Sequence, residues 1–268
     1  MMKRPKVGYH AVYDRDLFDA LEYAHGHGFD YIVPDLTVPR FWPESLDASE
    51  RRRLRRSIDN LGVSIALHAP MGLDLSVIYP DVRRGILKRL RRCLELARDL
   101  EALWMTIHPS QPPRFSSGGG EGTYLRDHLG LYREALMEGL VAAASEGVDI
   151  HVENDPLTPF IEDVLEEALG RLEGLYLALD VPKAQDPVKG QPEGVLEFYL
   201  RHRDRVRELH LHDRRPGGHG HDQLGLGGFE LERYLSLFDG VPYYTLEVRP
   251  RENAYRSLLW LEDYWRRL

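Results

Sequence analysis

Residues Glu208–Gly228 read ELHLHDRRPGGHGHDQLGLGG, and this stretch decides how the rest of the chain is interpreted. It holds four of the twelve histidines and two aspartates: His210, His212, His219, His221, Asp213 and Asp222. The apolar run Val206–Leu211 predicts a strand that delivers two of these histidines into a loop rich in glycine and arginine. Imidazoles gathered where a strand ends indicate a metal site or acid–base chemistry. Whether they form a site depends on what the other strands bring to the same place.

Length and composition suit one α/β barrel. The chain has 268 residues, of which 43% are hydrophobic and 29% charged, as in a globular protein with a large core. The formal charge of −8 disfavours nucleic acid as a partner without excluding a local basic groove. The single cysteine, Cys93, cannot form an internal disulfide, and neither a signal peptide nor a membrane-spanning run is visible. We therefore expect a cytoplasmic protein with no membrane partner.

Eight short apolar runs alternate with amphipathic segments along the chain. The predicted strands are Val7–Tyr9, Phe29–Val33, Val63–Leu67, Leu103–Ile107, Val148–Val152, Leu175–Leu179, Val206–Leu211 and Tyr243–Val248. Between two of them, Asp47–Glu50 predicts a helix capping box. The last helical stripe is Leu258, Leu261, Trp265 and Leu268. Eight such units predict a (β/α)8 TIM barrel, with residues 1–268 as a single domain.

Two segments have alternative interpretations. Residues Gln111–Gly122, QPPRFSSGGGEG, contain too much proline, glycine and serine for regular structure. They would form a loop on the C-terminal face of the barrel, either a mobile lid or a simple connection. The basic run Arg51–Arg56 is expected to be a solvated helix face, and nucleic-acid contact is the less favoured alternative.

Six consecutive predicted strands end in residue types that bind metals: His68, His108, Glu153, Asp180, His210 with His212, and Glu247. In a TIM barrel the active site lies at the C-terminal ends of the strands. Alternation along each strand places these side chains on the face opposite the apolar one, and hence toward the barrel axis. One such residue alone is commonly a helix cap or a satisfied core histidine. Six together predict a site.

Three carboxylates with several imidazoles suit a divalent ion such as Mn²⁺, Mg²⁺, Co²⁺ or Zn²⁺, and the lack of thiolates disfavours a structural zinc site. Arg214, Arg215 and Arg249 would add positive charge for a phosphate or carboxylate, or form salt bridges among loops. Phe41 and Trp42, after the second strand, would wall the pocket or serve as hydrophobic filler.

These motifs resemble the xylose isomerase-like TIM-barrel superfamily, which includes sugar and sugar phosphate isomerases and epimerases as well as endonuclease IV. The resemblance covers nearly the whole chain, and its most specific pieces are LHAP (67–70), LDLS (73–76), VEND (152–155), LHLHD (209–213) and LGLG (224–227). For the isomerase branch it implies four metal ligands, which are Glu153, Asp180, His210 and Glu247. His212 would then contact either the substrate or one of the metal ligands.

For endonuclease IV the resemblance implies further zinc ions. His68 and His108 match histidines that bind an additional zinc in that enzyme. Its third zinc uses a histidine where this chain has Lys183, and an Asp-x-His where this chain has His219-Gly220-His221. A lysine is a poor ligand unless its pKa is strongly depressed, so this departure disfavours a trinuclear cluster.

The leading hypothesis is a divalent-metal-dependent isomerase or epimerase that acts on a small sugar, sugar phosphate or polyol-derived ketose through a cis-enediolate. Glu153 and Glu247 would be the catalytic pair. The residues expected to bind a second metal or the substrate are His68, His108, His212, His221, Lys183 and Arg249. The alternative is an endonuclease IV-like zinc-dependent phosphodiesterase acting on abasic DNA. A barrel that binds without catalysis ranks last, and a homodimer is one candidate assembly.

Overall fold

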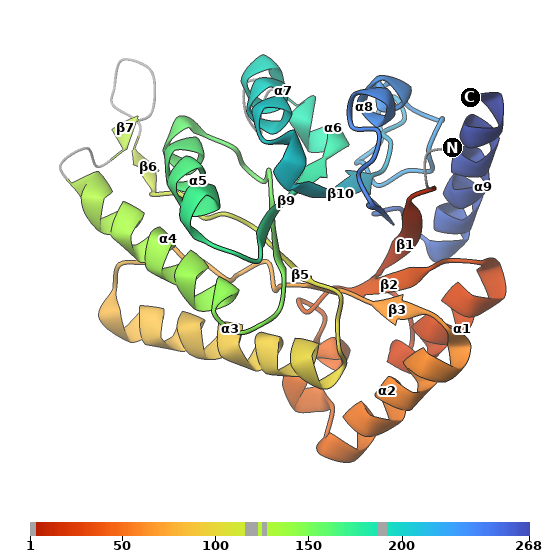
Figure 1. The fold of residues 1–268 in the computed structure, drawn as a ribbon, viewed down its shortest axis with the longest axis horizontal. Helices are drawn as coiled ribbons and strands as arrows, with labels where there is room; N and C mark the ends of the chain where they lie inside the picture. The colour runs from red at the N-terminus through yellow and green to blue at the C-terminus, as the bar shows by residue number, and fades with distance from the viewer. Residues whose placement is uncertain (1–3, 116–122, 125–127, 187–191) are drawn as a thin grey trace.

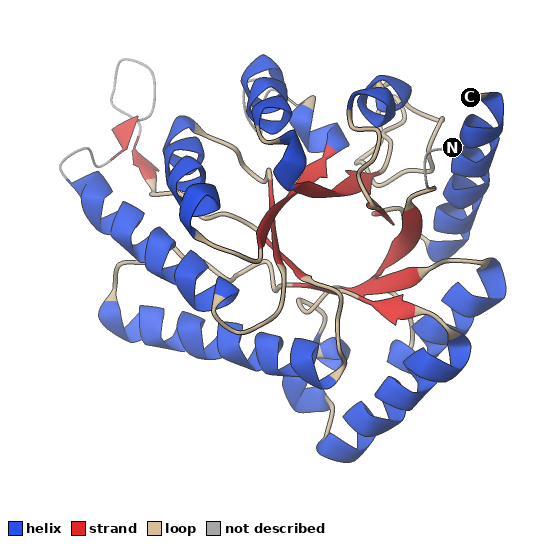
Figure 2. Cartoon of the chain, in the orientation of Figure 1, coloured by secondary structure: helices blue, strands red, loops and turns tan. Residues whose placement is uncertain are grey.

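The computed structural model describes residues 4–115, 123–124, 128–186 and 192–268, and these form a parallel barrel surrounded by helices (Figure 1). Hydrogen bonds join neighbouring strands in the order β3-β2-β1-β11-β10-β9-β8-β5-β4. The barrel strands are β1 (Lys6–Ala11), β2 (Tyr31–Pro34), β3 (Ser64–Ile65), β4 (Leu67–His68), β5 (Met105–Ile107), β8 (Ile150–Glu153), β9 (Leu175–Asp180), β10 (Val206–Leu211) and β11 (Tyr243–Leu246). Figure 2 shows them as a central ring inside the helices. The predicted (β/α)8 TIM barrel is confirmed.

The third strand closes this ring in two short pieces. The sequence predicts one strand over Val63–Leu67, whereas the structure has β3 and β4 on either side of Ala66. β3 pairs with β2, and β4 pairs with β5. The Ala66 N–H still donates to the carbonyl of Ile32 at 2.9 Å, so the backbone bonding continues through the break. Among the described barrel strands, none is left as a free edge.

The helices pack against the outside of the ring. They are α1 (Leu17–His27), α2 (Ala48–Leu61), α3 (Pro80–Asp99), α4 (Leu129–Ala144), α5 (Pro159–Arg171), α6 (Val181–Ala184), α7 (Pro192–Arg201), α8 (Leu231–Leu237) and α9 (Arg251–Arg267), with the 3₁₀ turns η1 (Pro39–Phe41), η2 (Pro43–Ser45) and η4 (Arg203–Arg205). The predicted capping box begins α2. The Asp47 carboxylate accepts the N–H groups of Ser49 and Glu50, and the Glu50 carboxylate accepts the Asp47 N–H.

The last predicted apolar stripe ends earlier than expected. Leu258 and Leu261 are buried, and Trp265 packs against the core. Leu268 lies beyond the end of α9 and is 83% exposed. The prediction for Leu268 is wrong because a helical spacing places a side chain on the core face only while the helix continues.

The segment Gln111–Gly122 contains more regular structure than its composition indicates. β6 (Arg114–Phe115) pairs with β7 (Thr123–Tyr124) in a short antiparallel ribbon. The expectation of irregular structure is wrong at Arg114–Phe115, because backbone hydrogen bonds can pair extended segments whatever their composition. The lid hypothesis concerns residues 116–122, which lie outside the described residues.

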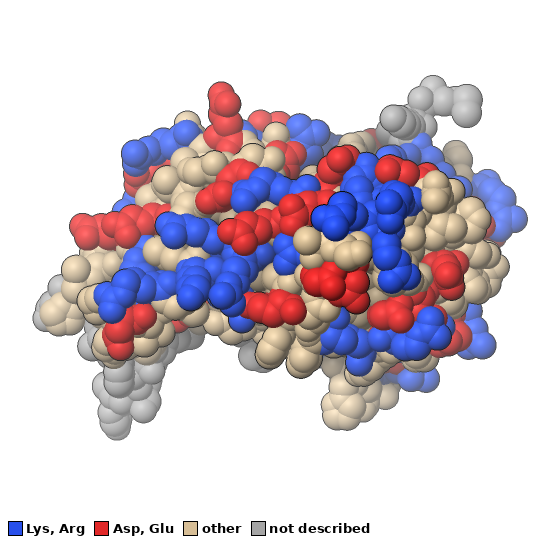
Figure 3. Space-filling view, turned by 90° about the horizontal axis from the view of Figure 1, so that it is seen from below, with Lys and Arg blue, Asp and Glu red and all other residues tan. Residues whose placement is uncertain are grey.

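The basic helix faces also carry acidic partners. On the face seen in Figure 3, lysine and arginine side chains are intermingled with aspartate and glutamate. Arg51 lies 2.6 Å from Asp99, while Arg55 lies 2.7 Å from Asp59 and 2.6 Å from Glu101. Such exposed pairs suit a solvated surface. None of the described helices is both long and apolar enough to cross a bilayer.

Polar side chains fill the middle of the barrel. We call this group the inner polar layer; its members are Tyr31, Trp104, Thr106, His151, Glu208 and Thr245, each at most 2% exposed. The Glu208 carboxylate accepts hydrogen bonds from the hydroxyls of Thr106 at 2.9 Å and Thr245 at 2.6 Å. The Trp104 indole N–H donates to the Thr106 hydroxyl at 3.1 Å. These bonds connect three strands across the barrel.

Gly8 on β1 makes room for this layer. A Cβ atom at Gly8 would lie 2.3 Å from the Tyr31 ring and 2.6 Å from the Tyr31 carbonyl oxygen. Tyr31 can therefore reach across the barrel, where its hydroxyl hydrogen-bonds with that of Thr245 at 2.9 Å.

Candidate functional site

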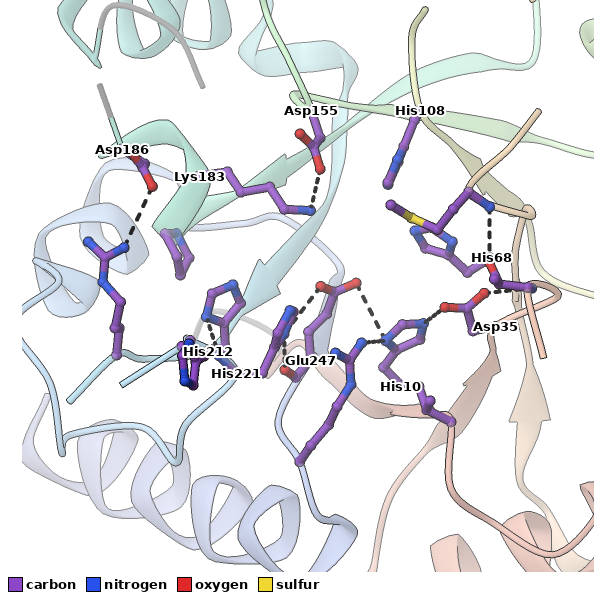
Figure 4. Close-up of a pocket in the computed structure, with 18 of the residues that line it drawn as sticks. His10, Asp35, His68, His108, Asp155, Lys183, Asp186, His212, His221 and Glu247 are labelled. Atoms are coloured by element: carbon purple, nitrogen blue, oxygen red, sulfur yellow. Dashed lines mark hydrogen bonds and ion pairs between the residues drawn. The ribbon is translucent and has the colours of Figure 1, made fainter. Parts of the chain in front are cut away.

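A pocket of about 480 Å³ opens at the C-terminal ends of the strands, within the usual size range for small ligands (Figure 4). Its lining includes Glu247 and all six residues that were expected to bind a second metal or the substrate, which are His68, His108, His212, His221, Lys183 and Arg249. Three other predicted ligands, Glu153, Asp180 and His210, are almost completely buried beneath it. The structure therefore brings all ten predicted site residues to one end of the barrel. Seven of them line the pocket, and the three buried ones form what we call the floor.

Glu153 at the end of β8 lies at the centre of this floor. Its Oε2 is 3.0 Å from Nε2 of His108 and 3.4 Å from both Nε2 of His68 and Nδ1 of His210. Its Oε1 contacts the Lys183 ammonium. Burial raises the pKa of Glu153, but the surrounding lysine and histidines outweigh it and hold this pKa well below its usual range. Glu153 is a buried carboxylate in its ionised form.

Glu247, after β11, shares His210 with Glu153. Glu247 Oε1 lies 3.2 Å from Nδ1 of His210 and 3.7 Å from Nδ1 of His10. Burial raises the pKa of Glu247, but the neighbouring His210 outweighs it and holds this pKa well below its usual range. Two ionised carboxylates thus approach the same imidazole nitrogen, and Glu247 also faces the open pocket.

Asp180 combines a helix cap with a place in the site. Its Oδ1 accepts the Lys183 N–H at 2.8 Å and so caps α6, which is the common role of a single polar residue at a strand end. Its Oδ2 lies 3.2 Å from the Lys183 ammonium and 3.8 Å from Nε2 of His212. One carboxylate oxygen of Asp180 is therefore structural, and the other faces the floor.

Lys183 provides a fixed positive charge. Its Nζ contacts Glu153 and lies 3.1 Å from Asp155 and 3.2 Å from Asp180. Burial lowers the pKa of Lys183, but these carboxylates raise it well above its usual range. This is the opposite of the depressed pKa that metal ligation by a lysine would need, because an ammonium has no lone pair.

The loop after β10 supplies His212 and His221, whose ring centroids lie 4.4 Å apart. His221 Nδ1 lies 2.7 Å from the Glu247 carbonyl oxygen, which can only accept, so this nitrogen carries the proton and Nε2 keeps its lone pair. Burial is the largest cause of a lowered His221 pKa, so the neutral ring is favoured. His221 also adopts a left-handed backbone conformation, with φ of 55°. His219 lies on the pocket rim and is exposed.

The two aspartates of this stretch shape the loop. Asp213 accepts the N–H groups of Gly225 at 3.1 Å and Gly227 at 2.9 Å, and a Cβ at Gly227 would lie 2.0 Å from its carboxylate. Asp222 pairs with Arg215 at 2.7 Å. The LGLG stretch is therefore a glycine turn wrapped around Asp213.

Three important residues were missed from the sequence: His10, Asp35 and Glu208. His10 and Asp35 also lie at strand ends, on the first two strands. A search for metal-binding residue types at the ends of all eight strands, instead of six, would have found them. Arg249 lies 3.2 Å from Nδ1 of His10, and Asp35 lies 3.5 Å from its Nε2. Burial is the largest cause that lowers the His10 pKa, to about 3, so this ring is neutral. Because a guanidinium can only donate, Nδ1 accepts and Nε2 carries the proton.

Of the remaining sequence candidates, some do not reach the pocket. Phe41 is fully buried and packs in the core, which agrees with the filler interpretation. Trp42 is 39% exposed and lies under the Arg89 guanidinium instead of walling the pocket. Arg214 lines the pocket, whereas Arg215 is bound to Asp222.

The donor atoms fit a divalent metal ion. Four groups of donors have ligand atoms within 4.8 Å of one another: His10, Asp35 and His68; His68, His108 and Glu153; His212, His221 and Glu247; and Glu153, Asp180 and His210. Within the described part of the chain, no hydrogen bond reaches Asp180 Oδ2, His212 Nε2 or either ring nitrogen of His210. Buried polar atoms are rarely left in this state, and a bound cation would complete them.

The comparisons with known proteins agree with the barrel fold. The family model described as xylose isomerase-like TIM barrel matches residues 21–264. An uncharacterised protein of Methanocaldococcus jannaschii is 28% identical over 170 residues, which span 61% of this chain and 60% of that protein's length.

Solved structures share the fold at lower identity. A D-tagatose 3-epimerase-like protein has a TM-score of 0.74 at 20% identity and covers 97% of each chain. The 3-keto-D-glucoside 4-epimerase of E. coli has a TM-score of 0.70 at 15% identity, over 97% of this chain and 100% of that one. A Thermus thermophilus protein soaked with zinc chloride has a TM-score of 0.67 at 23% identity, over 96% and 97%. At these identities the likeness shows the fold alone.

Proposed function

Because the chain belongs to the xylose isomerase-like TIM-barrel family, we propose that it is a divalent-metal-dependent isomerase or epimerase of a small sugar, sugar phosphate or polyol-derived ketose. One observation carries this proposal: the ionised carboxylates of Glu153 and Glu247 both lie within 3.4 Å of His210 Nδ1 at the pocket floor. Two bases beside one candidate metal ligand suit proton removal next to a carbonyl group. The epimerases among the structural neighbours support the same class of reaction.

The ion would be held by the four ligands that the resemblance implies, Glu153, Asp180, His210 and Glu247. Bound there, it would polarise a substrate carbonyl and acidify the neighbouring C–H bond. Glu247, which faces the pocket, would take the proton, and Glu153 would return it from the other side or at the neighbouring carbon. Proton removal would give a cis-enediolate, whose negative charge the Lys183 ammonium would stabilise.

Other cationic and neutral donors would orient the substrate. Arg249 lines the pocket and suits a phosphate, a carboxylate or a hydroxyl oxygen. His10 is neutral and presents its Nε2 proton near Asp35, so it can donate a hydrogen bond without adding charge. Such a pocket of charged and polar groups suits a hydrophilic ligand.

The proposal is tested by metal analysis followed by a proton-exchange screen. Purified protein should bind one or two divalent ions per chain, with Mn²⁺, Mg²⁺ or Co²⁺ supporting activity. Incubation in D₂O with a panel of ketoses, ketose phosphates and inosose-like polyols should give substrate-dependent deuterium incorporation, detected by NMR. A metal-loaded protein that exchanges no proton from any member of the panel would contradict the enediolate chemistry.

A zinc-dependent phosphodiesterase is the second candidate. The separate donor groups His68–His108–Glu153 and His212–His221–Glu247 favour it, because each could hold its own ion. Against it, Lys183 keeps its proton among the carboxylates, and His219 is exposed on the rim. About three zinc ions per chain together with cleavage of abasic DNA would replace the isomerase proposal with this one.

A further inference from the structure

Directly below His210, Glu208 takes part in no step of the proposed reaction, yet it is fully buried inside the barrel. Glu208 and His210 are two residues apart on β10, so both side chains point toward the barrel axis at successive depths. Nε2 of His210 lies 3.0 Å from Oε1 of Glu208, whereas Nδ1 points the other way, toward Glu153 and Glu247. The two nitrogens of one ring therefore face two different layers.

We propose that Glu208 is a positioning residue, which fixes the ring of His210 so that Nδ1 is presented to the metal. This inference rests on the proposed function, because it assumes that a divalent ion binds among the ligands around His210. A carboxylate behind a metal-binding histidine fixes the tautomer and the ring orientation and makes the ligand nitrogen more basic. Glu208 itself would not touch the ion or the substrate.

The contacts of Glu208 explain how it can hold a ring in place. Thr106 and His151 approach its Oε2 at 2.9 and 3.0 Å, and Thr245 approaches its Oε1 at 2.6 Å. These donors come from β5, β8 and β11, so the carboxylate is tied to three strands besides its own. A carboxylate held by so many donors has little freedom to turn, and it offers His210 a fixed acceptor.

The tautomer follows from the same arrangement. When an ion is bound at Nδ1, that nitrogen carries no proton, so the one remaining ring proton of His210 lies on Nε2, facing the Glu208 carboxylate. Nδ1 then keeps a lone pair directed at the floor where Glu153 and Glu247 converge. The 3.0 Å contact between Nε2 of His210 and Oε1 of Glu208 does not have the angles of a hydrogen bond in this structure.

The main test is the affinity for Co²⁺, measured without substrate by competition with a fluorescent chelator. Glu208→Gln keeps the size of the side chain and removes its charge, and we expect its Co²⁺ affinity to fall about 10- to 100-fold. Tyr31→Phe is the matched control, because it removes a buried hydroxyl of the same layer that bonds Thr245 and not Glu208. It should lower the unfolding temperature and leave Co²⁺ affinity within about threefold.

A second measurement needs no variant. Long-range ¹H–¹⁵N NMR of the zinc-loaded protein, labelled in its histidines, should find the His210 proton on Nε2 and the metal on Nδ1. Metal on Nε2, or equal loss of Co²⁺ affinity in Glu208→Gln and Tyr31→Phe, would overturn the positioning role. So would unchanged affinity in Glu208→Gln. If the wild-type protein bound no divalent ion, both the proposed function and the positioning role of Glu208 would be contradicted. The other outcomes would contradict only the positioning role.

Discussion

Two layers of side chains lie inside the barrel, and they differ in how completely their polar atoms are bonded. The inner polar layer is closed: the indole of Trp104, the hydroxyls of Thr106 and Thr245 and the Glu208 carboxylate bond one another. The layer above it, which we call the ligand layer, contains Glu153, Asp180, His210 and Glu247. It keeps buried nitrogens and oxygens without hydrogen bonds among the described residues.

This difference separates stability from function. A fully bonded buried network stabilises one arrangement of the barrel, whereas a buried layer with unbonded donors and acceptors is costly until a ligand completes it. Substitutions in the inner polar layer should therefore lower stability first. Substitutions in the ligand layer should affect metal binding and catalysis first.

The largest effect is expected from Glu247→Gln. This variant removes a base and a metal ligand while keeping the shape, so substrate-dependent deuterium exchange should fall about 100- to 10,000-fold. Glu232→Gln, at an exposed position of α8, is the control and should keep full exchange. Normal exchange in Glu247→Gln would remove this carboxylate from the proposed chemistry.

Lys183→Met tests whether the Lys183 ammonium stabilises the carboxylates of the ligand layer. Without the ammonium, Glu153 and Asp180 lose a buried partner, so the free energy of unfolding in EDTA should fall by about 3–5 kcal/mol. Mn²⁺ should recover more stability in this variant than in the wild-type protein. Urea unfolding with and without Mn²⁺ measures both changes in stability. Lys88→Met, at an exposed position of α3, is the control. Equal stability of the Lys183 variant and the wild-type protein in EDTA would contradict the assigned role.

Gly8→Ala should break the packing of the inner polar layer. The new Cβ would overlap both the ring and the carbonyl oxygen of Tyr31, so the free energy of unfolding should fall by about 3 kcal/mol. Gly26→Ala is a matched control inside α1, where nothing lies within 4 Å, and it should be neutral or stabilising. If the two variants had the same urea midpoint, the tight fit at Tyr31 would be refuted.

Thr245→Val should have the smallest effect of the four. It removes one donor to Glu208 and one partner of the Tyr31 hydroxyl, for an expected loss of about 1–2 kcal/mol. Ser145→Ala, at an exposed hydroxyl, should change stability by about 0.5 kcal/mol or less. If the Thr245 variant were as stable as the Ser145 variant, the hydrogen bonds of the inner polar layer would contribute little to the free energy of unfolding.

The sequence predicted the barrel from the alternation of apolar runs with amphipathic segments, and it predicted the floor of the site from the residues at the strand ends. Alternation along a strand places Glu153 and Glu247 inward without any knowledge of their partners. The charge state of Lys183 could not be predicted in this way, since it depends on three carboxylates that only the fold brings together. Glu208 was overlooked although alternation also turns it inward, because its partners lie on strands 37 to 102 residues away.

The pairing of β1 with β11 has a consequence for how the site is made in the cell. Lys6 is paired with Tyr243, and His10 lies 3.7 Å from Glu247, so these two strands, far apart in sequence, meet at the pocket. A nascent chain emerges from the ribosome N-terminus first, so β1 can pair with β2 early but must wait for β11 on its other side. The complete ligand set therefore forms only after Glu247 has been synthesised, and a product truncated before that residue cannot hold the ion with all four ligands.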